Sequence, residues 1–355
     1  MRIGILGYPQ SGKTTLFNVL SRAHAPTGLG AASSGAIQIG TVQVPDPRLE
    51  ALRDMFEPKK YTPARIEYID LAGQADSGRN QSALLPQQIT SADLILLVVR
   101  AFDDPAVHHP EGSVDPMRDV SNFTDELLLK DMAVVEGRIE RLKKAKGTGA
   151  KEAVEELPLM ERLLEALEAG TPLRDIELRP EEEKSVRGYQ FITAKPLLVV
   201  FNTGDGEAAG AGLVEKYAAG NKVLAVEISG KAEMEIADLE GDEQREFMEL
   251  LGITSSGLDR VIAASYGLLG VCSFFTVGTD EVRAWTIPDQ TPAVEAAGAI
   301  HSDLQRGFIR AEVVGGKELL EVGGMSAAKE KNLVRLEGKE YLVQDGDILN
   351  IRFSV

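Results

Sequence analysis

The chain has 355 residues, of which 43 % are apolar and 26 % charged, and its formal net charge is −17. This composition is typical of a soluble globular protein, and the length predicts two or three domains. No apolar run approaches the roughly 18 residues of a membrane span, and the acidic charge argues against a general affinity for DNA or other nucleic-acid phosphates. The single cysteine, Cys272, excludes an internal disulfide and predicts a reducing, cytoplasmic location.

The first predicted strand, residues 2–6, leads into a glycine-rich loop and then a helix. The loop matches G-x-x-x-x-G-K-S/T through Gly7, Gly12, Lys13 and Thr14. In this motif the backbone N–H groups surround the β-phosphate of a nucleotide, the lysine neutralises the β- and γ-oxygens, and the hydroxyl coordinates Mg²⁺. We therefore expect a nucleoside-triphosphate site with Mg²⁺ as cofactor. The other candidates for phosphate contact are Pro9, Gln10, Ser11 and Thr15.

A second strand is predicted at residues 65–69 and is followed by D-x-x-G, with Asp70 and Gly73. In switch NTPases this aspartate holds Mg²⁺ through water, and the glycine N–H senses the γ-phosphate. The pattern is weak alone, but it is specific when it ends the next strand after a phosphate loop. It favours a switch NTPase over a small-molecule kinase, which lacks the pairing.

After a third strand at residues 93–99, the region 122–170 has no strand signal, and its apolar residues follow a helical spacing of three and four. Two such stripes flank a glycine-bearing turn, which predicts a helical hairpin inserted into the α/β domain. Six basic residues and one acid lie between positions 138 and 151. They form either a solvated helix end or a contact for RNA phosphate. The basic residues are Arg138, Arg141, Lys143, Lys144, Lys146 and Lys151.

Two further strands, at residues 197–201 and 223–228, complete the pattern of a doubly wound, mostly parallel sheet. The first ends in Asn202, Thr203 and Asp205, where GTPases carry the guanine-binding N-K-x-D. An aspartate there accepts the N1–H and N2–H₂ donors of guanine, which adenine lacks. Ser229 follows the second strand, at the position of a second base-binding loop. The alternative for Asn202 is a turn residue after a strand.

Beyond a helix at residues 257–269 the chain is rich in predicted strands, with one helix at residues 292–305. This predicts an α+β domain. The expected organisation is thus an α/β P-loop NTPase domain formed by residues 1–120 and 191–270, a helical coiled-coil insertion at 121–190, and an α+β domain at 271–355.

Several long motifs resemble one family. They are GYPQSGKTTLFNVL at the phosphate loop, VPDPRLEAL, VVRAFDD and VDP in the first domain, and SYGLLGVCSFFTVGTDEVRAWTI near the C-terminal domain. Together they resemble the YchF family, the Obg-like ATPases of the translation-factor class, over nearly the whole chain. The resemblance implies a G domain, a coiled-coil arm and a β-grasp TGS domain. It also implies hydrolysis of ATP in preference to GTP, and association with ribosomes or another translation component.

Four positions bear on how this chain uses that site. Asp205 stands where the family has glutamate, and an aspartate at this position is the GTPase form. Gln74 stands where the family has a hydrophobic residue and ordinary GTPases have a water-orienting glutamine, so it is the first catalytic candidate; the alternative is an exposed polar loop residue. His109 aligns with a histidine that the family places near the nucleotide. Ser34 is the nearest match to the family's switch threonine and a candidate Mg²⁺ ligand.

The sequence therefore favours a nucleotide-hydrolysing switch, with ATP ahead of GTP, that docks on the ribosome. RNA contact is expected through the arm tip and the TGS domain. One alternative is a GTP-specific switch. The other is a nucleotide-gated scaffold with negligible turnover.

Overall fold

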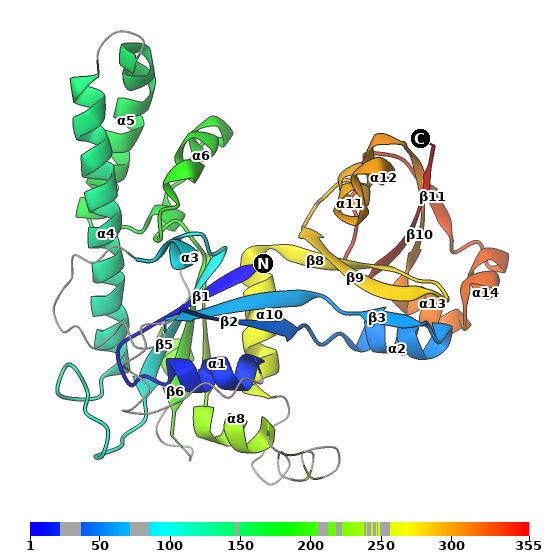
Figure 1. Ribbon diagram of the computed structural model, residues 1–355, viewed down its shortest axis with the longest axis horizontal. Helices are drawn as coiled ribbons and strands as arrows, with labels where there is room; N and C mark the ends of the chain where they lie inside the picture. Colours follow the sequence, from blue (N-terminus) through cyan, green and yellow to red (C-terminus); the bar gives the residue numbers. More distant parts are fainter. Residues whose placement is uncertain are drawn as a thin grey trace. The chain divides into compact units, whose positions relative to one another are not determined.

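The computed structural model describes residues 1–21, 37–71, 85–145, 149–204, 212–217, 222–237 and 256–354, together with residues 239, 243, 246 and 248. The chain divides into two compact units (Figure 1). The first unit is Met1–Val42 with Glu67–Leu268, and the second unit is Gln43–Ile66 with Leu269–Val355. None of the helices in the described part of the chain is long and apolar enough to cross a membrane.

The first unit is built on a six-stranded sheet with the order β2-β4-β1-β5-β6-β7. Strand β1 is parallel to β4 and β5, and β6 is parallel to β5 and β7. The predicted parallel sheet is confirmed, and the carboxyl ends of these strands therefore meet at one edge. The strands are β1 (Arg2–Leu6), β2 (Ile37–Gln43), β4 (Arg65–Leu71), β5 (Leu94–Ala101), β6 (Leu197–Thr203) and β7 (Val223–Ile228).

Every residue of the central strand β5 is buried, as expected for a strand covered on both faces. Its Leu97 and Val99 belong to one hydrophobic core with Val199 and Phe201 of β6. Apart from the pair described next, the helices within the described residues of this unit are α1 (Lys13–Ser21), α3 (Gln87–Thr90), α6 (Pro180–Val186), α7 (Leu213–Lys216), α8 (Gly230–Ala237) and α10 (Gly257–Leu269), with 3-10 turns at Leu173–Asp175 and Arg187–Tyr189.

Two long helices occupy the predicted insertion, α4 (Pro116–Lys144) and α5 (Gly149–Glu168), and lie side by side (Figure 1). We call this pair the helical arm. It has a core of its own, in which Val135 and Ile139 of α4 pack with Met160 and Leu163 of α5. The buried carboxylate of Asp131 anchors α4, because it accepts hydrogen bonds from the backbone N–H groups of residues 192 and 193.

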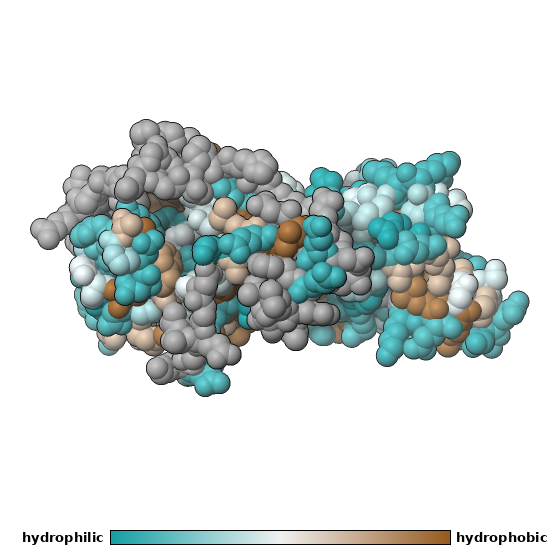
Figure 2. All heavy atoms as spheres, turned by 90° about the horizontal axis from the view of Figure 1, so that it is seen from below, coloured by the Kyte–Doolittle hydropathy of each residue, from teal (hydrophilic) through white to brown (hydrophobic). Residues whose placement is uncertain are grey.

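The second unit is a six-stranded mixed sheet with the order β11-β10-β12-β8-β9-β3. One face packs on a core around Phe274, the other on a core around Phe275. Hydrophobic residues (brown) are also visible among hydrophilic ones (teal) on its surface, at the right of Figure 2. The elements are α2 (Pro47–Phe56), β3 (Lys60–Thr62), β8 (Val271–Thr276), β9 (Glu281–Pro288), α11 (Ala293–Ile300), α12 (Ser302–Arg306), β10 (Phe308–Gly315), α13 (Gly316–Val322), α14 (Met325–Glu330), β11 (Arg335–Glu337) and β12 (Asp347–Phe353).

Residues 43–66 do not lie in the domain that was expected from the sequence. The expected domain was the nucleotide-binding domain, residues 1–120 and 191–270. Residues 43–66 belong to the second unit, because β3 pairs in parallel with β9 and because Leu49 and Leu52 of α2 are fully buried in the core around Phe275. The helix predicted at 292–305 is two helices, since His301 between them has extended backbone (φ −163°, ψ 142°) and caps α12 with its imidazole.

Candidate nucleotide site

The glycine-rich loop lies between β1 and α1, at the carboxyl edge of the first unit's sheet. Its two motif glycines have backbone angles that other residues rarely adopt, with φ of +144° at Gly7 and +97° at Gly12. A Cβ atom on Gly7 would lie 2.2 Å from the Val98 carbonyl oxygen. The loop can therefore take this path only with glycine at these positions, as a phosphate-binding loop requires.

The motif lysine lies against its own loop. The Lys13 Nζ donates hydrogen bonds to the carbonyl oxygens of Gly7, at 3.0 Å, and of Tyr8, at 2.7 Å. Lys13 is also the first residue of α1, so its charge adds to the positive end of the helix dipole. Both effects favour an anion at the loop.

Thr14 and Asp70 are brought together, although Thr14 lies in α1 and Asp70 near the end of β4. The Thr14 Oγ1 donates to the Asp70 Oδ2 at 3.0 Å, and the carboxylate is fully buried. Burial raises the pKa of Asp70, and the Thr14 hydrogen bond and the Lys13 charge oppose this only in part. The second oxygen, Oδ1, has no hydrogen-bond partner among the described residues. A buried carboxylate oxygen beside a threonine hydroxyl is a donor set that fits Mg²⁺, which prefers oxygen ligands.

Two more buried polar atoms of the loop lack a hydrogen-bond partner within the described part of the chain. They are the Gln10 Oε1 and the Ser11 Oγ. Gln10 also has a positive φ of 62°, which is uncommon outside glycine. Because buried polar groups are nearly always satisfied in folded proteins, unsatisfied ones at a glycine loop are consistent with a ligand that completes their bonding. Pro9 and Thr15 are half-buried beside them.

Asn202 braces the phosphate loop. Its Nδ2 donates to the Ser11 carbonyl oxygen at 3.0 Å, and its Oδ1 accepts the Gly230 N–H at 2.9 Å. A Cβ on Gly12 would lie only 2.1 Å from that Nδ2. The amide thus joins the phosphate loop to the start of α8.

The other predicted base-contact residues also have local bonds. The Thr203 Oγ1 donates to the Ile228 carbonyl oxygen at 3.0 Å, and the Ser229 Oγ accepts the Ala232 N–H at 3.2 Å. These bonds stabilise the ends of β6 and β7 and the first turn of α8. Contact of Asn202, Thr203 and Ser229 with a base stays a prediction.

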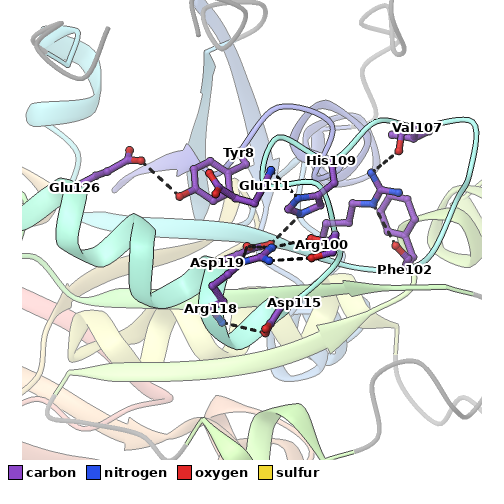
Figure 3. A network of polar contacts seen from close by, with 11 residues as sticks. Tyr8, Arg100, Phe102, Val107, His109, Glu111, Asp115, Arg118, Asp119 and Glu126 are labelled. Carbon is purple, nitrogen blue, oxygen red and sulfur yellow. Dashed lines mark hydrogen bonds and ion pairs between the residues drawn. The ribbon is translucent and has the colours of Figure 1, made fainter. Parts of the chain in front are cut away.

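His109 is buried beside the phosphate loop and faces α4 (Figure 3). Its Nε2 lies 2.9 Å from the Asp119 Oδ2, and its Nδ1 accepts the Glu111 N–H at 3.2 Å. Arg118 pairs with the other oxygen of Asp119 at 2.8 Å. Asp119 was not singled out from the sequence, which shows it only as one of several acids near the start of a helix. His109 and Asp119 border a small cavity between the phosphate loop and α4, and its other lining residues include Tyr8, Pro9, Ser11 and Phe123.

Several predicted site residues lie outside the described residues. They are Ser34, Gly73, Gln74, Lys146 and Asp205. The structure includes the backbone of Lys151 in α5, but its side chain is outside the described set.

The predicted basic tip of the arm is partly neutralised by acids of the arm itself. Arg138 donates to both carboxylate oxygens of Glu156, at 3.1 and 2.6 Å. Lys143 and Lys144 form exposed ion pairs at 3.0 and 3.3 Å with glutamates of α5 and α4. Exposed pairs of this kind are weak and exchange readily. Of the six predicted contact residues, Arg141, Lys143 and Lys144 are exposed and remain able to contact an external phosphate.

Comparison with known proteins places this geometry in a family. Residues 2–136 match the family model MMR_HSR1, described as "50S ribosome-binding GTPase", and residues 271–354 match YchF-GTPase_C, described as "Protein of unknown function (DUF933)". A Bacillus subtilis protein named Ribosome-binding ATPase YchF is 43 % identical, over 99 % of both chains. The chain belongs to the YchF family. A Haemophilus influenzae protein of the same name is 39 % identical, over 100 % of this chain and 99 % of the relative.

Solved structures agree with this assignment. The structure described as the Schizosaccharomyces pombe YchF GTPase has a TM-score of 0.82 at 28 % identity, and the match covers 99 % of this chain and 97 % of that one. A GTP binding protein from Pyrococcus horikoshii OT3 shares the fold, with a TM-score of 0.61 at 18 % identity over both full chains. The YchF resemblance inferred from the sequence is confirmed. The names of these YchF proteins differ in the nucleotide, ATP for the bacterial relatives and GTP for the fission yeast one.

Proposed function

We propose that this YchF protein is a Mg²⁺-dependent switch that binds and hydrolyses a nucleoside triphosphate, prefers ATP, and works with the ribosome in the cytoplasm. The observation that carries the proposal is the 3.0 Å hydrogen bond from Thr14 to the buried carboxylate of Asp70, beside the charge of Lys13 at a glycine loop. This set of groups suits a triphosphate and its metal ion. The full-length bacterial relatives named as ribosome-binding ATPases support the rest.

Each group has one task in this proposal. The loop N–H groups and Lys13 bind the β- and γ-phosphates, while Thr14 and Asp70 hold the metal with Ser34 as a further hydroxyl. Mg²⁺, when bound, neutralises charge on the phosphate oxygens. We propose that the Gly73 N–H senses the γ-phosphate.

The groups that act on the attacking water are proposed from sequence. In this proposal Gln74 orients the water through its amide, and His109 is a second candidate. Single-turnover hydrolysis by Gln74→Ala tests the first role, and an unchanged rate removes Gln74 from the mechanism. A negligible wild-type rate would overturn the hydrolase in favour of the scaffold.

The base preference is tested by titrating ATP and GTP against the wild-type protein and Asp205→Ala. We expect ATP to bind more tightly to the wild type. The alternative is a GTPase, which is favoured by the aspartate at position 205 and by the name of the fission yeast structure. Tighter GTP binding by about tenfold (a difference of ~1.4 kcal/mol), lost in Asp205→Ala, would establish that alternative.

For the ribosome contact, we propose the helical arm as the coiled-coil arm of the family and the region 271–355 as a β-grasp TGS domain. Both would reach ribosomal RNA. Binding of ribosomes should then weaken steeply with salt and be lost when Lys143, Lys144 and Lys146 are all changed to glutamate. Unchanged binding would eliminate the arm tip.

A matched triple reversal in the second unit separates the two proposed surfaces. Its three lysines are exposed and the change in net charge is the same, so a general charge effect would weaken binding equally in both variants. A larger loss in the arm variant identifies the arm as the main contact. The control residues are Lys317, Lys331 and Lys339.

A further inference from the structure

One residue of the phosphate loop reaches the helical arm. The Tyr8 carbonyl oxygen accepts the 2.7 Å hydrogen bond from Lys13, but the side chain leaves the loop toward α4. There the ring packs edge-on against Phe123, with centroids 5.6 Å apart and planes at 77°. The hydroxyl donates a long hydrogen bond of 3.5 Å to the Glu126 Oε1 (Figure 3). Tyr8 is therefore bonded to the phosphate-binding lysine at one end and to α4 at the other.

The two partners on α4 form one contact surface. Phe123 and Glu126 are three residues apart, so they lie on the same face of the helix. Tyr8 and Phe123 also line the small cavity that His109 and Asp119 border. In that pair the His109 Nε2 lies 2.9 Å from the Asp119 Oδ2. The side of the loop that carries Tyr8 and the first turns of α4 thus share a continuous set of contacts.

α4 can carry a displacement from this surface to the far end of the arm. It has 29 residues, which makes it about 43 Å long at 1.5 Å per residue. Beyond the contact with Tyr8 it packs on α5 through the buried side chains of Leu128, Val135 and Ile139. Densely packed helices move together, so a small shift near Phe123 moves the pair.

We propose that Tyr8 couples phosphate occupancy of the loop to the position of the helical arm. The inference rests on the proposed function, because it requires that the loop binds a triphosphate. A triphosphate offers the Lys13 ammonium charged oxygens in place of, or in addition to, the Gly7 and Tyr8 carbonyls. The bond to Tyr8 then differs in strength between the empty and occupied loops, and this difference shifts the equilibrium position of the Tyr8 ring on α4.

Such coupling is reciprocal. If the triphosphate changes the equilibrium of the arm, then a partner that holds the arm in one position changes triphosphate affinity by the same factor. Couplings of this kind commonly amount to a factor of about 5 to 150. Tyr8 would act as a positioning residue, without contact to the reacting atoms.

Hydrogen exchange on the full chain tests the coupling directly. Peptides from residues 128–145 and 156–168 are followed with and without a saturating, non-hydrolysable ATP analogue and Mg²⁺. We expect the analogue to change exchange in these peptides by about fivefold in the wild type, the low end of the usual range. The response should be lost in Phe123→Ala and Tyr8→Ala. Tyr8→Phe keeps the ring and should retain most of the response.

The matched control is Leu128→Ala, also on α4 but in the arm core away from the Tyr8 contact. It should raise exchange in the arm without nucleotide and keep the response to the analogue. This separates coupling from simple loss of stability, which would affect Leu128→Ala and Phe123→Ala alike.

The outcomes distinguish this inference from the proposed function. A wild-type protein that does not bind the analogue overturns the proposed function. One that binds it with no change in arm exchange overturns the coupling alone. If either Phe123→Ala or Tyr8→Ala keeps the full response to the analogue, Tyr8 is not the link. If Phe123→Ala does not fold, the response of Tyr8→Ala alone tests the coupling.

Discussion

Replacing Asp70 by asparagine tests the metal role of the buried carboxylate. Asp70 is fully buried, and only one of its oxygens has a hydrogen-bond partner among the described residues, the Thr14 hydroxyl. Asparagine has nearly the same size and can still accept that bond through its Oδ1. The substitution therefore removes the charge with little change in packing.

The expected effect on stability has opposite signs without and with ligand. A buried, unsatisfied polar group costs about 1–3 kcal/mol, and more when it is charged, so we expect metal-free Asp70→Asn to be about 1 kcal/mol more stable than the wild type. In a unit of this size that raises the Tm by about 2–4 °C. With nucleotide and Mg²⁺ at 100 times Kd, the wild type gains about 2.7 kcal/mol. The variant, without the carboxylate, gains much less.

Calorimetric unfolding with EDTA, and then with Mg²⁺ and a non-hydrolysable analogue, measures both effects on the transition of the first unit. Asp125→Asn is the matched control, because Asp125 is exposed on α4 and its replacement should change the Tm little in either condition. A metal-free Asp70→Asn protein that is less stable than the wild type would refute the assignment of an unsatisfied carboxylate. Equal stabilisation of both proteins by Mg²⁺ and analogue would refute the metal role.

Three further predictions use the same site and the arm. Gly12→Ala puts a Cβ 2.1 Å from the Asn202 Nδ2 at a φ of +97°, so we expect calorimetric titration to detect no tight nucleotide binding; wild-type affinity would contradict the loop geometry. Burial raises the pKa of Asp70, and Mg²⁺ needs the ionised form. The affinity for nucleotide with Mg²⁺ should therefore fall on acidification at a higher pH than for an ordinary aspartate, and titrations across pH should show no such fall in Asp70→Asn. Hydrogen bonds from Arg138 lower the pKa of Glu156, so their stabilisation is present at neutral pH and lost as the pH falls through that lowered pKa. Arg138→Ala should destabilise the arm by about 1–2 kcal/mol at neutral pH and less in acid, as measured by hydrogen exchange; an effect independent of pH would show that the pair does not matter.

Local patterns predicted several elements of the first unit, among them the strand that leads into the phosphate loop. Strands β1 and β7 and helix α10 have the predicted bounds, because each is a short apolar run or an amphipathic stretch between glycine or polar residues. The meeting of Thr14 with Asp70 also follows from sequence. Parallel neighbouring strands end at one edge, so a loop after β1 and an aspartate in β4 must come close.

Contacts between distant segments were beyond such patterns. β3 and α2 resemble any strand and helix of the first unit. Their place in the second unit depends on contacts with segments far along the chain, such as the pairing of Lys60 with Glu281 and the packing of Leu49 with Phe275. The bonds of Arg138 to Glu156 likewise depend on the register of α4 against α5. A count of basic residues at the arm tip could not show which charges are already paired.

The partner of His109 is a similar case. The histidine was predicted near the nucleotide by resemblance alone, and the structure places it beside the phosphate loop, 2.9 Å from Asp119. Asp119 is in the first turn of α4, and its burial depends on how that helix packs against the end of β5. No local pattern in the chain distinguishes it from the exposed acids around it.

Asn202 changes how the base-binding motif is understood. Its amide needs both a donor and an acceptor, since Nδ2 holds the Ser11 carbonyl and Oδ1 holds the Gly230 N–H. Aspartate would lack the donor, and glutamine would be one methylene too long for two bonds of 3.0 and 2.9 Å. The loop architecture therefore requires asparagine at this position whichever base is bound, and the conformation does not depend on a lysine at position 203. Asn202 thus carries no information about ATP or GTP, and the discrimination falls to the residues that follow it, which is why Asp205→Ala is the decisive variant.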